Sequence, residues 1–346
     1  MGLRSYIITR ILLTIPTLLL LLSMVFLVMR VLPGDPVALH FEKRATPEQM
    51  ESMRRALGLD KPLWAQYLEY LGGLVDIGYI LDHGYPNLGR SMYQTSEEVG
   101  GQIFSAFPAT LELAIYSMII ASVIGVLLGV ASSKSYNSIS DHLIRGFGTV
   151  TYAVPIFFLG IVFQLIFGVY LRWLPTSLRI NPAVDPPATI TGLYTIDSLL
   201  QGNLLGFFES LKALLLPSLT LGIILSGMFI RMTRTNMLET LRLDFVTAAK
   251  ARGLKESTVT YGYALRNAFL PILTMMGLQF AILLGGAILT EKTFSWPGLG
   301  TYIVDRIDFR DYTAIQGAVV MFGLFVTLVS LVVDILYAYL DPRIRL

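Results

Sequence analysis

The hydrophobic positions of the chain gather into long uninterrupted runs instead of alternating with polar positions. Six runs lack Asp, Glu, Lys and Arg and are bounded by charged residues: Ile11–Met29, Leu113–Ser133, Gly146–Leu171, Ala213–Ile230, Asn267–Thr290 and Tyr312–Val333. A helix rises about 1.5 Å per residue, so about 20 apolar residues cross the roughly 30 Å hydrocarbon layer of a bilayer. A backbone in contact with lipid must satisfy its own hydrogen bonds, so the spans have to be helical. The pattern predicts an all-α integral membrane protein with six transmembrane helices.

The composition agrees with a membrane protein. Of the 346 residues, 54% are hydrophobic and 14% are charged, whereas soluble domains carry about 25% charged residues. The first run follows Arg4 and Arg10 but is too long for a signal peptide, and no A-x-A-like cleavage site precedes Pro33. We therefore interpret it as an uncleaved anchor. The chain has no cysteine, which excludes disulfides and thiolate metal sites, and its net charge of +2 does not indicate nucleic acid binding.

The distribution of Lys and Arg among the loops predicts the orientation. The loop Met232–Arg266 carries six basic and three acidic residues, and the N-terminus and the tail Asp341–Leu346 are also basic. The loop Glu291–Asp311 carries three basic and four acidic residues. Short cytoplasmic loops are enriched in Lys and Arg, so we expect both termini, the loop Met232–Arg266 and the short loop Lys134–His142 in the cytoplasm.

Three segments are left for the opposite side. The first, Leu32 to about Phe107, is long enough for helices of its own. Thr46-Pro47-Glu48-Gln49 is typical of a capped helix start, with a helix expected to end near Gly58 and another from about Pro62 to Leu71. The second segment includes Ser198–Phe208, which is apolar but too short to span and is expected to lie at the interface or re-enter. The third is the loop Glu291–Asp311.

These boundaries divide the chain into three parts. Residues 1–31 hold the N-terminus and the first span, residues 32–107 form an extracytoplasmic segment with short helices, and residues 108–346 form the core with the other five spans. The core includes the cytoplasmic loop 232–266.

The cytoplasmic loop contains a short segment suited to contact another surface. Residues 244–254 read as an alanine-rich helix that ends at Gly253, a residue able to take positive φ, and a second helix is expected from about Ser257. Small residues at 248, 249 and 251 predict a smooth face, ringed by basic residues at 250, 252 and 255. On composition alone, a connector that lies on lipid headgroups is an equally good interpretation.

The same segment resembles the coupling motif of ABC-importer permeases, E-A-A-x-x-x-G, with Thr247 in place of the glutamate. Further matches point to the dipeptide/oligopeptide/nickel branch, in the subunit with a long extracytoplasmic segment after its first helix: Leu32-Pro33-Gly34-Asp35-Pro36, Ala45-Thr46-Pro47-Glu48, Leu57-Gly58-Leu59-Asp60, Gln66-Tyr67, Leu88-Gly89-Arg90-Ser91, Leu265-Arg266-Asn267, Phe294-Ser295-Trp296-Pro297-Gly298-Leu299-Gly300, Arg310-Asp311-Tyr312 and Gln316-Gly317. The chain departs from the family pattern at Tyr263, where a polar residue is common, and in added residues at about 79–87 and 173–211.

The resemblance implies a permease subunit that forms half of a translocation pathway in the inner membrane of a prokaryote. It implies a second homologous permease, two subunits that bind ATP and Mg, and an extracytoplasmic substrate-binding protein. The residues expected to contact the ATPase are Asp244, Thr247, Ala248, Ala249, Lys250, Arg252, Gly253 and Leu254. The sequence contains no G-x-x-x-x-G-K-[ST] phosphate loop, so we expect a transport subunit without catalytic activity or a cofactor of its own. Peptides are the expected cargo, with oligosaccharides and nickel complexes as alternatives.

Other residues admit two interpretations each. Trp296-Pro297-Gly298 is either an extracytoplasmic docking or substrate loop, or a rigid turn anchored by tryptophan at the interface. Glu112 and Asp334 lie in spans, where an acid is functional or a hydrogen-bonded structural group. Prolines at 155, 217 and 271 are expected to kink helices.

Two other classes of function fit the sequence less well. A secondary transporter would show inverted repeats, which the sequence lacks. An intramembrane hydrolase or a proton relay would need reactive residues in the spans, but His40, His83 and His142 all lie outside them.

Overall fold

The computed structural model describes residues 3–31, 37, 46–93, 97–285 and 287–340, and these residues form helices without any strand. Several residues named above lie outside the described residues: Leu32–Pro36 and Ala45 of the family pattern, His40 and the basic tail. The side chain of Asp334 also lies outside the described part. Five helices are long and apolar enough to cross a membrane: α1 (Leu3–Val31), α6 (Val99–Lys134), α10 (Leu204–Thr240), α12 (Arg266–Leu284) with the preceding π-helix η2 (Thr258–Leu265), and α15 (Tyr312–Leu340).

The third predicted span is not one straight helix. It consists of α7 (Ile139–Ala153), α8 (Ile156–Phe163) and the π-helix η1 (Gln164–Tyr170), and the chain bends by 101° between α7 and α8. The bend lies at Pro155, whose ring disfavours the helical conformation at the preceding residue; Val154 accordingly is extended, with φ −77° and ψ 128°. Counting this pair as one span gives the six predicted. Pro217 and Pro271 lie inside uninterrupted helices.

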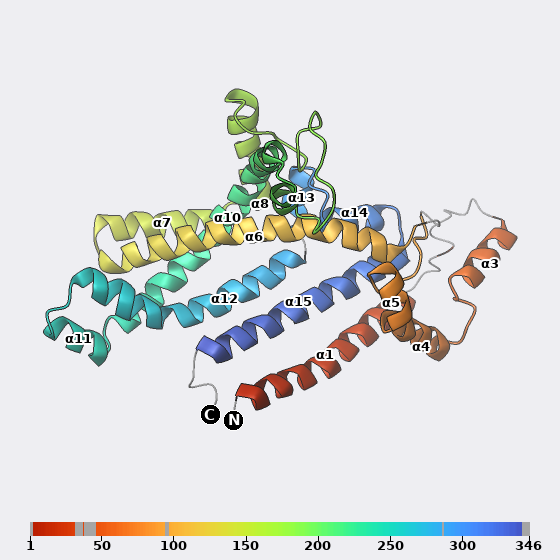
Figure 1. Cartoon of the computed structure of the whole chain (residues 1–346), viewed down its shortest axis with the longest axis horizontal. Coiled ribbons are helices and arrows are strands. Elements are labelled where there is room, and N and C mark those ends of the chain that lie inside the picture. The colour runs from red at the N-terminus through yellow and green to blue at the C-terminus, as the bar shows by residue number, and fades with distance from the viewer. Residues whose placement is uncertain (1–2, 32–36, 38–45, 94–96, 286, 341–346) are drawn as a thin grey trace.

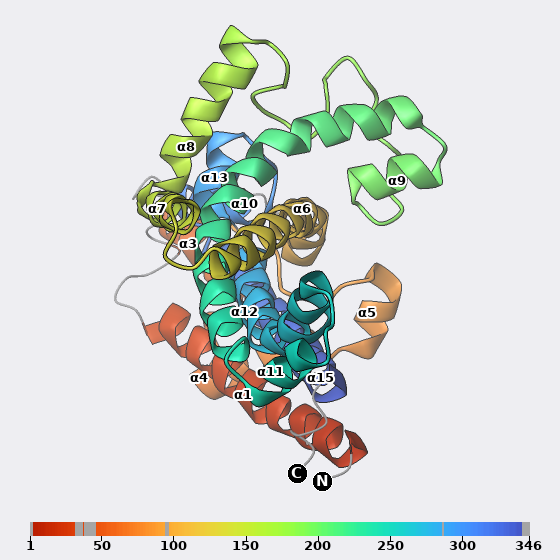
Figure 2. The same cartoon turned by 90° about the vertical axis from the view of Figure 1, so that its left-hand side faces the viewer.

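The long helices run side by side, and α8 points away from them (Figures 1 and 2). Close packing of α6 against α10 depends on glycine. A Cβ atom at Gly125 would lie 2.3 Å from the Cβ of Phe229, and one at Gly129 would lie 2.5 Å from the Cβ of Thr233. Small residues let the backbones of membrane helices approach closely, so these glycines hold α6 and α10 together at the centre of the molecule.

The two ends of the helix bundle differ. The α11 end holds α11 (Asp244–Ala251), the start of α1 and the end of α15, whereas the opposite end, the α4 end, holds α3 (Pro47–Ala56), α4 (Leu63–Leu74) and α5 (Ile77–His83) (Figure 1). The predicted capping box is confirmed, because the Thr46 hydroxyl accepts from the Gln49 N–H and the Gln49 side chain accepts from the Thr46 N–H. The predicted boundary at 107/108 falls inside α6, where the helix continues without a break.

Helices also occupy the other two segments that were predicted to lie on the extracytoplasmic side. Ser198–Phe208 is not one interfacial element, because α9 (Tyr194–Leu200) ends within it and α10 begins within it, where Asn203 caps the start of α10 through the Gly206 N–H. The span predicted for Asn267–Thr290 ends at Leu284. The following loop contains α13 (Ile288–Thr293) and α14 (Leu299–Asp308).

Candidate functional site

The predicted alanine-rich helix is present as α11, between the end of α10 and the start of η2. Its last turn is followed by Gly253 with φ +73°, as the pattern of residues predicted. Asp244 lies in the first turn, where a negative charge interacts favourably with the helix dipole. Figure 2 shows α11 at the face of the bundle that is turned toward the viewer. The segment is therefore a short, defined helix at one end of the molecule.

One side of α11 is packed against the membrane helices. Val246 and Ala249 are 0% and 4% exposed, and they pack in a cluster with Val130 of α6, Met237 of α10 and Val259 of η2. Ala249 is therefore not part of an accessible smooth face with Ala248, because consecutive helical residues are about 100° apart. Its role in this structure is to attach α11 to the bundle.

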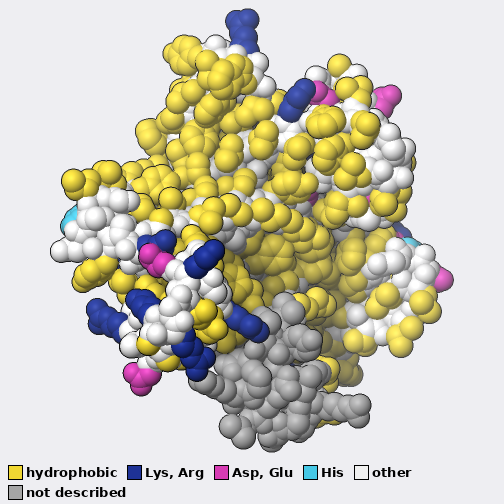
Figure 3. Space-filling model, turned by 60° about the vertical axis from the view of Figure 1, so that its left-hand side comes forward, with side chains coloured by type: hydrophobic (Ala, Val, Ile, Leu, Met, Phe, Trp, Pro, Cys, Tyr) yellow, Lys and Arg dark blue, Asp and Glu magenta, His cyan; other side chains and the backbone are white. Residues whose placement is uncertain are grey.

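The other side of α11 is open. Thr247, Ala248, Lys250 and Ala251 are exposed, as are the following Arg252, Gly253 and Leu254. Phe245 is 37% exposed and adds an aromatic ring to this surface. It was not among the residues expected to contact a partner. Lys and Arg side chains gather at this end of the molecule, whereas apolar side chains cover the spans (Figure 3). The result is an exposed surface of small and apolar residues bordered by positive charge.

A buried ion pair connects the helices behind α11. Arg234 of α10 donates to both carboxylate oxygens of Asp141 of α7, at 2.8 Å each, and the Ser132 hydroxyl of α6 also donates to Asp141. Asp141 is 0% exposed. Asp141 is not recognisable from the sequence, because a single acid at the start of a helix gives no sign of a partner 93 residues away.

At the α4 end, Trp296-Pro297-Gly298 forms a turn that is largely buried. Trp296 is 1% exposed, and its Nε1 donates to the Ala109 carbonyl at 2.8 Å. A Cβ atom on Gly298 would lie 2.5 Å from the Thr110 hydroxyl oxygen. Of the three residues, Pro297 is exposed. The geometry favours the rigid turn, anchored in protein and not at a membrane interface, over a loop that presents tryptophan to a substrate.

Glu291 also contacts residues next to this turn, and its role could not be recognised from the sequence. It is 0% exposed and accepts hydrogen bonds from the Thr110 hydroxyl at 2.8 Å and the Thr301 N–H at 2.9 Å. Burial raises the pKa of Glu291 above its ordinary value, and these hydrogen bonds act in the opposite direction. Glu291 thereby joins α6, α13 and α14.

Glu112 is a structural acid by its contacts. Its carboxylate pairs with Arg179 at 2.6 Å and accepts from the N–H and hydroxyl of Thr195 at 2.8 and 2.7 Å. The Arg179 guanidinium also lies 3.7 Å from the centre of the Tyr194 ring. These contacts tie α6 to the long segment between η1 and α10, and they use both carboxylate oxygens.

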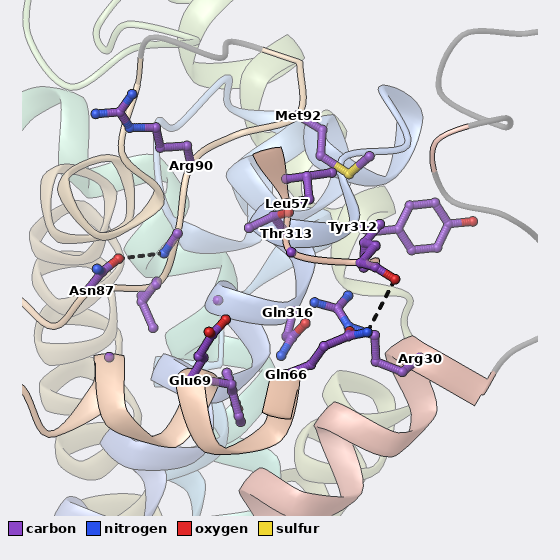
Figure 4. A pocket seen from close by; sticks show the side chains of 17 residues that line it. Arg30, Leu57, Gln66, Glu69, Asn87, Arg90, Met92, Tyr312, Thr313 and Gln316 are labelled. Carbon is purple, nitrogen blue, oxygen red and sulfur yellow. Dashed lines mark hydrogen bonds between the residues drawn. The ribbon is translucent and has the colours of Figure 1, made fainter. Parts of the chain in front are cut away.

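A polar cavity of about 370 Å³ lies at the α4 end, between the end of α1, α4 and the start of α15. Arg30, Gln66 and Gln316 line it (Figure 4), and Gln66 donates through Nε2 to the Lys61 carbonyl at 2.7 Å. Within the described ranges, no group of three or more His, Cys, Asp or Glu side chains is placed to hold a metal ion.

Comparisons with known proteins identify relatives over nearly the whole chain. Residues 121–346 match the family described as binding-protein-dependent transport system inner membrane component, and residues 3–114 match the N-terminal region of such membrane components. The dipeptide transport system permease protein DppB of Alkalihalophilus pseudofirmus is 40% identical, covering 99% of both chains. The di/tripeptide permease protein of Pseudomonas aeruginosa is 40% identical, covering 99% of this chain and 98% of that protein. A glutathione transport system permease protein of Salmonella typhimurium is 37% identical, covering 99% of both chains.

A solved structure shares the fold. A chain of the MetNI methionine ABC transporter in an inward-facing conformation aligns with a TM-score of 0.54 and 13% identity, covering 70% of this chain and 97% of that chain. The chain is thus a multi-pass membrane protein with the fold of an ABC-importer permease. It belongs to the family of binding-protein-dependent transport system inner membrane components.

Proposed function

We propose that this chain is the permease subunit of an ATP-driven importer that carries di- or oligopeptides across the inner membrane of a prokaryote. The observation that carries the proposal is the likeness, along nearly its whole length, to permeases named for dipeptide and di/tripeptide transport. The chain supplies half of the pathway, a second homologous permease supplies the other half, and an extracytoplasmic binding protein delivers the cargo. Two separate ATPase subunits bind ATP and Mg, so the chain itself is not an enzyme.

In this proposal α11 is the element that receives the motion of the ATPase. Its open side, with Phe245, Ala248 and Lys250, inserts into a groove on the ATPase, while its inner side is packed on α6, α10 and η2. Movement of the groove then displaces α11 as a rigid body and shifts the helices packed on it. The pathway changes between inward and outward access because bound ATP and the docked binding protein favour different states.

The proposed orientation places the α11 end in the cytoplasm. The loop between α10 and η2 is rich in Lys and Arg, and the start of α1 and the end of α15 lie at the same end (Figure 1). Cytoplasmic loops are enriched in these residues. The α4 end, with the Trp296 turn, then faces the binding protein.

The test is uptake by proteoliposomes that contain this chain with its second permease, both ATPase subunits and the binding protein. We expect uptake of labelled di- and tripeptides that requires ATP hydrolysis and persists when ionophores remove ion gradients. The control is a complex whose ATPase binds but does not hydrolyse ATP. Uptake driven by a gradient without ATP would contradict the importer, and uptake of oligosaccharides or nickel complexes instead of peptides would contradict the cargo.

A further inference from the structure

A second feature of the α11 end is a pocket of about 260 Å³ between α7 and α10. Its floor contains Gly148, Gly227 and the buried Ile230, and its rim carries polar and basic side chains: Arg145, Thr149, Tyr152, Arg231, Arg234 and Thr235. The two helices meet at the glycines, where a Cβ atom on Gly227 would lie 2.6 Å from the Gly148 carbonyl oxygen. The pocket therefore forms where α7 and α10 meet closely at two glycines and larger side chains surround the contact.

The pocket is lined by three arginines, and a protein carboxylate pairs with one of them. Arg234 is paired with Asp141. Within the described part of the chain, Arg145 and Arg231 have no carboxylate within ion-pair distance, and the Arg231 guanidinium lies 5.6 Å from the centre of the Tyr152 ring. The hydroxyls of Thr149 and Thr235 donate to carbonyls of their own helices. The donors left for a ligand thus include the guanidinium groups of Arg145 and Arg231, whose planar N–H groups match the oxygens of a phosphate.

The position of the pocket distinguishes a lipid from a soluble anion. Arg145 and Tyr152 are exposed on α7, the first part of a bent candidate span, and Arg231 is exposed on the candidate span α10, at the end where basic residues gather. Tyr152 is 69% exposed, and tyrosine is favoured at the level of the lipid headgroups. Basic pockets between helices on the cytoplasmic side are suited to anionic headgroups.

We infer that the pocket between α7 and α10 binds the phosphate of an anionic phospholipid from the cytoplasmic leaflet. Arg145 of α7 and Arg231 of α10 hold the phosphate from the two sides, and the Tyr152 ring covers the Arg231 guanidinium. A lipid bound in this way joins α7 to α10 next to the Asp141–Arg234 ion pair. The inference uses the orientation proposed above and is independent of the cargo.

The experiment is native mass spectrometry of the full chain, released from detergent with cardiolipin, phosphatidylglycerol or phosphatidylcholine. We expect the apparent affinity for the two anionic lipids to exceed that for phosphatidylcholine by about thirtyfold, as two basic groups near the headgroup would provide. The variant R145Q/R231Q should lose this preference. The matched control R242Q/K255Q removes the same charge from exposed residues of the same end and should retain it.

The inference would be overturned if anionic and zwitterionic lipids were retained equally, or if the control variant lost the preference for anionic lipids to the same extent as R145Q/R231Q. It would also be overturned if inorganic phosphate at millimolar concentration displaced the lipid and bound in its place. A second measurement applies if R145Q/R231Q does not fold. A photoreactive benzoylphenylalanine at position 152 should capture phospholipid in membranes that contain the whole complex. Capture of an ATPase subunit or of the second permease at that position would show that protein occupies the pocket and would also overturn the inference.

Discussion

The helix α11 and the Trp296 turn both lie in connections between membrane-spanning helices, but most residues of α11 are exposed whereas most residues of the turn are buried. In α11 the residues Val246 and Ala249 are buried and the other side chains are exposed. In the Trp296 turn, Trp296 and Gly298 are buried and Pro297 is exposed. The first arrangement leaves one side of the helix exposed, while the second connects α6, α13 and α14. Two motifs that are equally prominent in the sequence therefore differ in how much of their surface they expose.

The largest expected effect comes from two neighbouring alanines of α11. Ala248→Glu puts a charge on the open side, so the purified permease should fold while ATP-dependent uptake in proteoliposomes is abolished. Ala249→Glu buries an unpaired charge in the cluster with Met237 and Val259, which is strongly unfavourable, so the yield of folded protein should fall as well. Wild-type uptake by Ala248→Glu would refute the contact with the ATPase, and equal folding of both variants would refute the sidedness of α11.

The parts of this comparison that depend on local pattern were predictable. The apolar runs gave the spans, Thr46 and Gln49 gave the start of α3, and Gly253 gave the end of α11, because each depends on residues close in the sequence. The inward orientation of Ala249 was not predictable, because alanine fits a packed or an exposed face equally well. Arg179 lies 67 residues from Glu112, and Thr110 lies 181 residues from Glu291, so only the folded chain brings these two pairs together.

The next effect tests the rigid character of the Trp296 turn. Trp296→Ala removes a fully buried side chain and its hydrogen bond to Ala109, so we expect a loss of about 3–5 kcal/mol in the free energy of unfolding. The measurement is the unfolding of the purified chain in detergent. Trp173→Ala is the matched control, because Trp173 is 66% exposed and its loss should change stability by about 0.5 kcal/mol or less. Similar losses in both variants would contradict a structural role specific to Trp296.

A smaller effect is expected at the ion pair that ties α6 to the segment before α9. Glu112→Gln leaves the Arg179 guanidinium buried beside a neutral amide, at a cost of about 3 kcal/mol in unfolding free energy. The control Lys292→Gln breaks a pair whose side chains are 39% and 45% exposed, and such surface pairs contribute about 0–1 kcal/mol. If Glu112→Gln instead kept full stability but lost peptide uptake, Glu112 would belong to the transport pathway and not to the scaffold.

The smallest effect is a pH dependence at Glu291, on the rigid side of the comparison. Because burial raises the pKa of its carboxyl in the folded state, its contribution to stability is complete below the pKa of the unfolded chain, about 4.3, and is lost as the pH rises through the higher folded value. Glu291→Gln keeps an acceptor for the Thr301 N–H but does not ionise. Its unfolding temperature, measured from pH 4 to pH 8, should therefore fall less with rising pH than that of the wild type. Parallel curves would show that the pKa of Glu291 is the same in the folded and the unfolded chain, with the hydrogen bonds from Thr110 and Thr301 offsetting the effect of burial.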